Sequence, residues 1–157
     1  MRSAKVVNSP IGVLTLVEEE GALAEVRFGQ RLAGEALCDT PVLLQAAQEL
    51  DEYFQGKRHD FSVPIAPKGT PFQLKCWTAL VQIPYGETRT YAQQAAAIGQ
   101  PKASRAVGMG NHRNPLPIFI PCHRVIGKNG TLTGYAGGLE MKEYLLTLER
   151  MNRHDPA

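Results

Sequence analysis

A segment rich in proline and glycine, KRHDFSVPIAPKG at residues 57–69, separates two stretches of different pattern. Before it, residues 5–29 alternate short β-branched runs with turn residues, which predicts an antiparallel meander. After it, residues 70–115 show helical spacing and helix-capping residues. At 157 residues the chain suits one domain or two small lobes that share an interface. We therefore predict a two-lobed α+β fold, with an amino lobe at 1–66 and a carboxyl lobe at 67–157.

Capping residues mark one helix in each lobe. The stretch PVLLQAAQELDEYFQG begins after Thr40 and ends at Gly56, so the amino lobe is predicted to be antiparallel β-sheet plus one helix. That lobe has no cluster of histidine and cysteine and no glycine-rich phosphate loop, and we assign it a scaffold role. In the carboxyl lobe, Thr70 is an N-cap residue and Pro71 takes the first position of a helix that ends before Pro84.

Residues 88–115 match the layout of a helix-turn-helix, with an alanine-rich first helix, a short turn and a second helix from about Lys102. The carboxyl lobe is therefore predicted to be mainly helical and similar to a winged helix. The second helix carries small residues, and Arg105 alone projects from it, whereas a helix that reads the major groove would carry several Asn, Gln or Arg. Small side chains suit the minor groove, which is only about 6 Å wide. Close packing against another helix is the alternative, and pattern alone does not decide between them.

Charge is divided unevenly along the chain. Residues 1–66 carry six Lys and Arg against ten Asp and Glu, whereas residues 67–157 carry eleven against five. A basic carboxyl half suggests an anionic partner such as nucleic acid, and uneven scatter of surface charge explains the numbers equally well. No stretch approaches the roughly 18 apolar residues of a membrane span, so we expect a cytoplasmic protein without a membrane partner.

Three cysteines, Cys38, Cys76 and Cys122, are spaced too widely for a disulfide framework or a zinc site, which predicts free thiols. Cys38 lies in a polar stretch and is interpreted as a loop residue. Cys76 lies four residues from both Phe72 and Leu80, which places it on the apolar stripe of a helix and in the core.

The third cysteine follows an apolar run in PLPIFIPCHRVIG, residues 115–127. We predict a buried strand at 118–120, so that Cys122 lies at its end. A lone cysteine is more often inert packing than a nucleophile, but His123 and Arg124 follow at once and favour the thiolate. Because adjacent residues of an extended segment point to opposite faces, a water between the thiol and the imidazole is expected.

The last predicted helix, GGLEMKEYLLTLERM, supplies carboxylates that could orient this histidine. Its buried side is predicted to carry Leu139, Leu145, Leu146 and Leu148. Glu149 falls either near the core and His123 or in solvent, and Glu140 and Glu143 are expected to face solvent.

With these residues in place, the chain closely resembles the O6-alkylguanine-DNA alkyltransferases, the methylated-DNA–protein-cysteine methyltransferases. The resemblance runs from about Gly69 to Glu149 through GTPFQ, IPYGET, TYAQQAA, RAVG, NHRNP, IPCHRVI and GYAGGL, and the amino lobe matches only in general character. It implies a DNA-repair protein that binds the minor groove of double-stranded DNA, flips out an O6-alkylated guanine and moves the alkyl group irreversibly and stoichiometrically to Cys122. A monomer is implied; cooperative binding along DNA and activity on O4-alkylthymine are left open.

The resemblance also implies a role for each matching residue. Cys122 would be activated through water by His123 and Glu149, while Tyr91 donates to the departing guanine and Asn114 braces the turn at the active site. The implied DNA contacts are Ser104, Arg105, Ala106, Gly108 and Tyr91, with Arg105 filling the space left by the flipped base. The implied pocket residues are Tyr135, Val125, Gly137 and Gly138. No cofactor and no metal are implied, because the amino lobe lacks the Cys/His set that binds zinc in some relatives.

One residue departs from the family's pattern: Gly110 stands where alanine is expected, which predicts a more flexible recognition helix and weaker DNA binding. Two rival functions are considered. An alkyltransferase-like protein that binds the lesion without transfer would lack the acceptor cysteine, which is present. A Cys-His hydrolase would need a separately placed base and an oxyanion hole, and would turn over many times.

Overall fold

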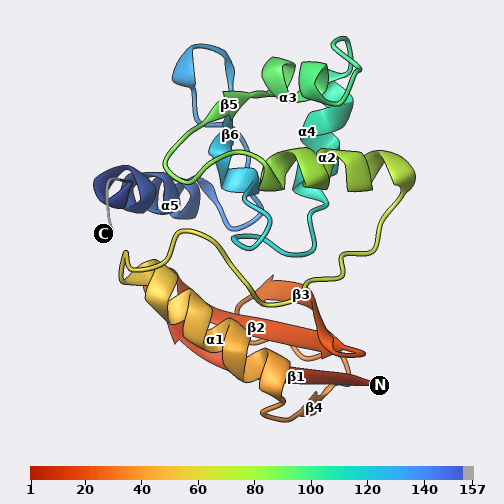
Figure 1. Ribbon diagram of the computed structural model, residues 1–157, viewed down its shortest axis with the longest axis vertical. Coiled ribbons are helices and arrows are strands. Elements are labelled where there is room, and N and C mark those ends of the chain that lie inside the picture. The colour runs from red at the N-terminus through yellow and green to blue at the C-terminus, as the bar shows by residue number, and fades with distance from the viewer. Residues whose placement is uncertain (154–157) are drawn as a thin grey trace. The chain divides into compact units, whose positions relative to one another are not determined.

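The computed structural model describes residues 1–153, which form two compact units, Met1–Lys68 and Gly69–Arg153 (Figure 1). Each unit has its own secondary structure and core. In the part of the chain that is described, no helix is both long and apolar enough to cross a membrane.

The amino unit is built on a four-stranded sheet in the order β3-β2-β1-β4. Strands β1 (Arg2–Ser9), β2 (Gly12–Glu19) and β3 (Ala22–Phe28) pair antiparallel, so the predicted meander is confirmed. The two-residue strand β4 (Ala36–Leu37) pairs parallel with β1, which makes the complete sheet mixed. The sequence does not predict β4, because two exposed residues carry no periodicity.

Helix α1 (Pro41–Phe54) packs against this sheet, and its bounds agree with the capping signals (Figure 1). The Thr40 side chain accepts a hydrogen bond from the Leu43 amide, and the chain leaves the helix through Gly56 with a φ of 76°. The same buried face carries a carboxylate, Glu49, which is 4% exposed.

The carboxylate of Glu49 is saturated by neighbours within the amino unit. It accepts hydrogen bonds from the backbone amides of Ser62 and Val63 at 2.8 and 3.1 Å and from the Gln45 side chain at 2.9 Å. These bonds fasten the proline-rich segment after α1 to the helix, so Glu49 serves the fold.

The carboxyl unit contains most of the helices. Its regular elements are α2 (Pro71–Val81), β5 (Arg89–Thr90), α3 (Tyr91–Ala97), α4 (Ser104–His112), β6 (Val125–Ile126) and α5 (Leu139–Asn152). Strands β5 and β6 form a short parallel ladder beside α3. The predicted fold class is confirmed, with helices α3 and α4 arranged as the helix-turn-helix.

Helix α2 packs closely against α4, and a glycine makes the approach possible. Thr70 and Gln73 form a capping box at the start of α2. The indole of Trp77 donates to the Gly110 carbonyl at 2.9 Å, and a Cβ at Gly110 would lie 3.1 Å from the sulfur of Cys76. Cys76 is buried as predicted. The sulfur of Cys76 would therefore crowd the methyl group of an alanine at position 110.

Helices α3 and α4 are joined by a buried pair of amides. The Gln94 side chain donates to the Asn111 side chain at 2.9 Å, and Asn111 donates back at 2.7 Å. Gln94 also donates to the Cys76 carbonyl at 3.1 Å, which ties α2 to the pair. Helix α4 begins at Ser104, slightly later than predicted, without a side-chain cap at Ala103.

The strand predicted at 118–120 is wrong. The segment is buried, but it forms only one isolated bridge, between Pro117 and Ile120, and Ile118 has a φ of 78°. Prolines at positions 117 and 121 remove two backbone donors, so the run cannot continue a ladder. It instead enters a 3-10 turn, Cys122–Arg124, which brings three functional side chains out of one tight bend.

The buried face of α5 also differs from the prediction. Its buried residues are Lys142, Leu145, Leu146 and Glu149, which follow helical spacing. Leu139 is 49% exposed and Leu148 is half-buried, whereas Glu140 and Glu143 are exposed as expected. Two charged side chains thus occupy core positions, and each has polar partners there.

Candidate active site

Cys122 opens the 3-10 turn and lines a cavity of about 160 Å³. Other residues around this cavity are Tyr91, Asn111, Asn114, Pro117, Gly134 and Tyr135. The thiol is half-buried, and burial raises its pKa, whereas Asn114 and the charge of Lys142 act to lower it. The cavity therefore contains one nucleophile whose ionisation needs help from a neighbouring base.

Asn114 braces the loop that leads to the thiol. Its side-chain nitrogen donates to the Ile120 carbonyl at 2.8 Å, and its oxygen accepts from the Leu116 amide at 2.9 Å. The Cys122 amide donates to the same Ile120 carbonyl. The Asn114 side chain thus makes hydrogen bonds to two backbone groups of a segment that has no strand partner to pair with them.

His123 is fully buried, and its two ring nitrogens differ. Nε2 lies 2.6 Å from Oε2 of Glu149, while Nδ1 has no hydrogen-bond partner among the described residues. Burial lowers the pKa of His123 more than Glu149 raises it, so the neutral ring is favoured. A neutral ring that donates from Nε2 to a carboxylate presents a free lone pair at Nδ1.

Glu149 is 1% exposed and accepts several hydrogen bonds besides that of His123. Arg124 donates from Nε at 2.8 Å and from Nη2 at 3.1 Å, and the Gly86 amide donates at 3.2 Å. Burial alone would raise the pKa of Glu149, but His123 and Arg124 outweigh it and place that pKa far below its usual range. The carboxylate stays ionised and orients the imidazole.

Arg124 belongs to this cluster, which its sequence position does not predict. Its third nitrogen donates to the Ile83 carbonyl at 2.7 Å, and its guanidinium lies over the ring of Tyr85. Arg124 was assigned only an effect on the thiolate, because its sequence position beside Cys122 suggests no other partner. Glu149, its actual partner, lies 25 residues away on α5.

Lys142 was also missed. It is fully buried, and its ammonium donates to the carbonyls of Val125 at 2.6 Å and Thr133 at 3.0 Å. Burial lowers the pKa of Lys142, while Cys122 raises it. The sequence does contain a signal for its burial, because Lys142 precedes Leu145 by three residues and so lies on the same face of the predicted helix. Val125, which the resemblance implied as a pocket residue, does not line the cavity, and its carbonyl accepts from this lysine.

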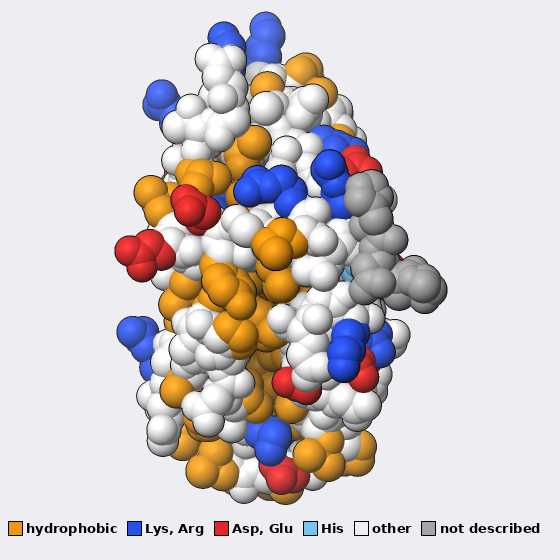
Figure 2. Space-filling view, turned by 90° about the vertical axis from the view of Figure 1, so that its left-hand side faces the viewer, with side chains coloured by type: hydrophobic (Ala, Val, Ile, Leu, Met, Phe, Trp, Pro, Cys, Tyr) orange, Lys and Arg blue, Asp and Glu red, His pale blue; other side chains and the backbone are white. Residues whose placement is uncertain are grey.

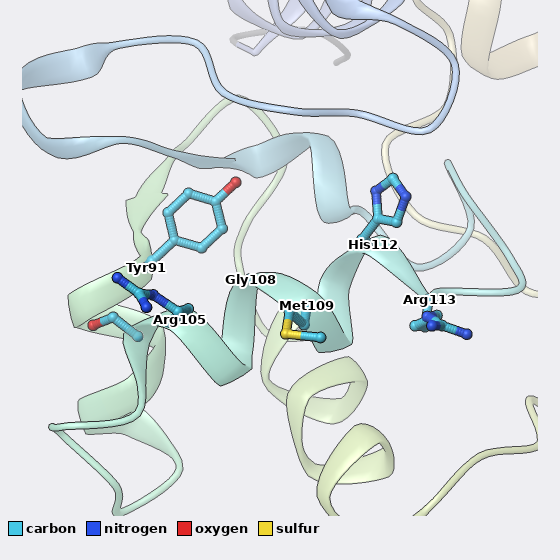
Figure 3. Close-up of a pocket in the computed structure, with 7 residues that line it drawn as sticks. Tyr91, Arg105, Gly108, Met109, His112 and Arg113 are labelled. Carbon is cyan, nitrogen blue, oxygen red and sulfur yellow. The ribbon is translucent and has the colours of Figure 1, made fainter.

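A larger and more open groove of about 560 Å³ lies along α4 (Figure 3). It is lined by Tyr91, Ser104, Arg105, Gly108, Met109, His112 and Arg113. Tyr91, Gly108 and His112 also line the smaller cavity, so the two spaces share a wall. Figure 3 shows Gly108 on α4 between Tyr91 and His112, and a Cβ there would lie 3.6 Å from the Tyr91 ring.

The structure brings most of the expected residues to these two spaces. Four of them line the groove: Tyr91, Ser104, Arg105 and Gly108. Tyr135 is buried at the cavity wall, where burial raises its pKa well above the usual range.

Three of the expected residues lie elsewhere. Ala106 is exposed on α4 outside the groove lining, and Gly137 and Gly138 lie outside the cavity lining. Met109, His112 and Arg113 were not predicted, although their spacing from Arg105 places them on one helix face.

Positive charge at the groove comes from the exposed side chains of Arg105 and Arg113. On the face drawn in Figure 2, Lys and Arg side chains lie singly or in small groups and do not form one continuous patch. On that face positive charge is therefore divided among small groups, and Arg105 and Arg113 provide a local basic site at the groove.

Comparisons with known proteins agree along nearly the whole chain. The domain described as "6-O-methylguanine DNA methyltransferase, DNA binding domain" matches residues 71–151, and its "ribonuclease-like domain" matches residues 4–67. The constitutive methylated-DNA–protein-cysteine methyltransferase of Bacillus subtilis is 51% identical over 153 residues, covering 92% of this chain and 93% of that protein. The corresponding protein of Methanosarcina barkeri is 48% identical over 155 residues, covering 94% and 96%.

Solved structures give the same result. The Mycobacterium tuberculosis OGT in complex with DNA has a TM-score of 0.89 and 42% identity, covering 96% of this chain and 94% of that chain. An O6-methylguanine DNA methyltransferase from Methanococcus jannaschii has a TM-score of 0.73 and 27% identity, covering 94% of each chain.

Proposed function

The chain belongs to the 6-O-methylguanine DNA methyltransferase family, whose work is DNA repair by alkyl transfer, and we propose that its own Cys122 is the alkyl acceptor. One observation carries this assignment. Cys122 lines a cavity, and the next residue, His123, is held by Glu149 through Nε2, while its Nδ1 is buried without a hydrogen-bond partner among the described residues. A nucleophile, a base and an orienting carboxylate are thus supplied within one unit.

In the proposed reaction the Cys122 sulfur attacks the alkyl carbon on O6 of guanine. A carbon–sulfur bond forms, the carbon–oxygen bond breaks, and its electron pair stays with the guanine. The thiol proton passes through a water to Nδ1 of His123, and the ionised Glu149 stabilises the resulting imidazolium. Because the thioether has no route back to a thiol here, one protein molecule accepts one alkyl group.

We propose that the groove along α4 receives the minor groove of double-stranded DNA. The helix presents Ser104 and Gly108 to the groove, and these small residues permit close approach. The lesion would be flipped into the smaller cavity past Tyr91, whose ring borders both spaces. Arg105, exposed beside the groove, would occupy the stack that the base leaves, because a planar cation stacks as well as hydrogen-bonds.

The departing guanine needs a proton or hydrogen bond at a ring nitrogen, which we assign to the Tyr91 hydroxyl. Tyr135 would form the apolar wall beside the alkyl group, and Asn114 would keep the loop before Cys122 in place. Every group named belongs to Gly69–Arg153 of a single chain, which supports a monomer as the acting species.

The test is to incubate the protein with duplex DNA that carries O6-methylguanine and to map the peptides by mass spectrometry. We expect one methyl group per molecule, on the peptide containing Cys122. Cys122→Ala should bind the same duplex and gain no methyl, while Cys76→Ala serves as the matched control and should still be methylated at Cys122. Methylation of Cys76 or Cys38 would contradict the site, and lesion binding without methylation would favour a recognition protein.

A further inference from the structure

We infer that Thr133 is a positioning residue for the alkyl-transfer step: its hydroxyl orients that of Tyr91 and donates to it as the guanine departs. This inference rests on the proposed function, since it assigns a partner to the residue proposed to serve the leaving group. The observation behind it is a hydrogen bond of 2.6 Å between the two hydroxyl oxygens, which joins residues 42 positions apart.

The Tyr91 ring is fixed before Thr133 reaches it. Tyr91 is the first residue of α3, whose start is set by a capping box between Thr90 and Gln93. The ring packs over Gly108 of α4. With its Cα and ring face fixed, the remaining freedom of Tyr91 lies in where its O–H bond points, and the nearest polar partner decides that.

Thr133 is itself held at three points. Its carbonyl accepts from the buried ammonium of Lys142 at 3.0 Å, and its hydroxyl meets Tyr91. Its methyl group faces Gly127, where a Cβ would lie only 3.0 Å away. A glycine at 127 therefore gives the methyl its space, and the methyl position turns the hydroxyl toward Tyr91.

Counting protons gives the direction of this hydrogen bond during the reaction. Each hydroxyl has one hydrogen and accepts through its lone pairs. While Tyr91 donates to guanine it has no second hydrogen, so its bond with Thr133 must run from Thr133 to the tyrosine oxygen. If the phenolic proton transfers, the proton on Thr133 stays where it is and stabilises the phenolate, and hydrogen bonds to charged oxygens are roughly twice as strong as neutral ones.

The experiment compares three side chains at position 133. Thr133→Val keeps the shape without the hydroxyl, and Thr133→Ser keeps the hydroxyl without the methyl. Single-turnover methyl transfer from duplex O6-methylguanine, and benzyl transfer from free O6-benzylguanine, should both slow by about 10-fold or more in Thr133→Val, the size expected for losing a hydrogen bond to a charged group. Thr133→Ser should restore most of the rate. DNA affinity should stay unchanged, because Thr133 does not line the α4 groove.

A second background separates orientation of Tyr91 from general packing. In Tyr91→Phe there is no hydroxyl to orient, so adding Thr133→Val should slow transfer no further. The inference is overturned if Thr133→Val transfers at the wild-type rate, if Thr133→Ser is as slow as Thr133→Val, or if the valine slows transfer equally in the Tyr91→Phe background. Thr133→Ala replaces the valine variant should that one not fold.

The outcomes also separate this inference from the proposed function. Wild-type protein that never gains a methyl on Cys122 would refute the proposed function. Normal methylation of Cys122 with a wild-type rate in Thr133→Val would refute only the role of Thr133. A wild-type rate in Tyr91→Phe would remove the roles of both Tyr91 and Thr133 and leave Cys122 as the acceptor.

Discussion

Each unit of the protein buries a glutamate in its core, and the two differ in what their partners can still do. Glu49 on α1 accepts hydrogen bonds from Gln45 and from backbone amides, and these neutral donors cannot act as acid, base or nucleophile. Glu149 on α5 accepts from Arg124 and from His123, whose second ring nitrogen has no hydrogen-bond partner within residues 1–153. A buried carboxylate that accepts a full set of hydrogen bonds therefore does not by itself identify a reactive site. The distinguishing feature is a partner with an unused atom, next to a nucleophile that lines a cavity.

The strongest challenge to this comparison is to neutralise each glutamate in turn. Glu149→Gln is expected to slow methyl transfer at least about 100-fold, because it removes the charge that lets His123 accept the thiol proton. Glu49→Gln is expected to lower the free energy of unfolding by about 1–3 kcal/mol with no change in rate per folded molecule. Single-turnover kinetics and urea unfolding of both variants give the two quantities. Equal transfer rates for both variants would erase the distinction.

Matched arginine substitutions sharpen the comparison. Arg124 donates to both oxygens of Glu149, whereas Arg58 reaches Glu49 only at 4.0 Å and is 28% exposed. Lysine cannot reproduce the paired geometry, so Arg124→Lys should lower the free energy of unfolding by about 2–3 kcal/mol. Arg58→Lys should lower it by less than about 1 kcal/mol, as for an exposed ion pair. Similar losses in urea titrations would show that the guanidinium does not clamp Glu149.

Acidification should weaken the two units in different pH ranges. The pKa of His123 is lowered by burial, so the neutral ring stabilises the fold above the unfolded value of 6.5, and this contribution is lost as the pH falls below it. In the amino unit, hydrogen bonds from Arg27 lower the pKa of Glu35 to about 2, so its contribution is lost only below 4.5.

Between pH 6.5 and 4.5 we therefore expect amide hydrogens of Gly69–Arg153 to lose protection while those of Met1–Lys68 keep theirs. The free energy of unfolding falls by about 1.4 kcal/mol for each unit by which the pKa of His123 in the folded protein lies below its unfolded value. Hydrogen exchange corrected for the intrinsic effect of pH measures it residue by residue. Simultaneous loss of protection in both units at pH 6 would be the contrary result, and His123→Gln should abolish the loss in this range.

Local signals in the sequence predicted the elements that local chemistry decides. Thr40 and Thr70 mark the starts of α1 and α2, and alternating β-branched runs mark the meander. The apolar run at 118–120 was misread because burial is common to strands and loops, while flanking prolines decide against a ladder.

The parts of the site that could not be predicted depend on distant partners. Lys142 and Arg124 are buried charges, and the groups that satisfy them lie 9 to 41 residues away along the chain. Sequence spacing cannot supply that information. Gly110 is similar: its weak helix propensity is visible in the sequence, whereas its close approach to Cys76 is not. The effect of Gly110 on DNA affinity stays a prediction.

Helix α5 carries both Lys142 and Glu149, the two charged groups that secure the segment from Cys122 to Thr133. A ribosome, which adds about 5–20 residues per second, therefore incorporates Cys122 before the residues that complete the surroundings of its thiol. During that interval the nascent polypeptide has an ordinary cysteine, with an imidazole that nothing aligns. Under the proposed mechanism, the thiol therefore gains an aligned base only when the final helix docks.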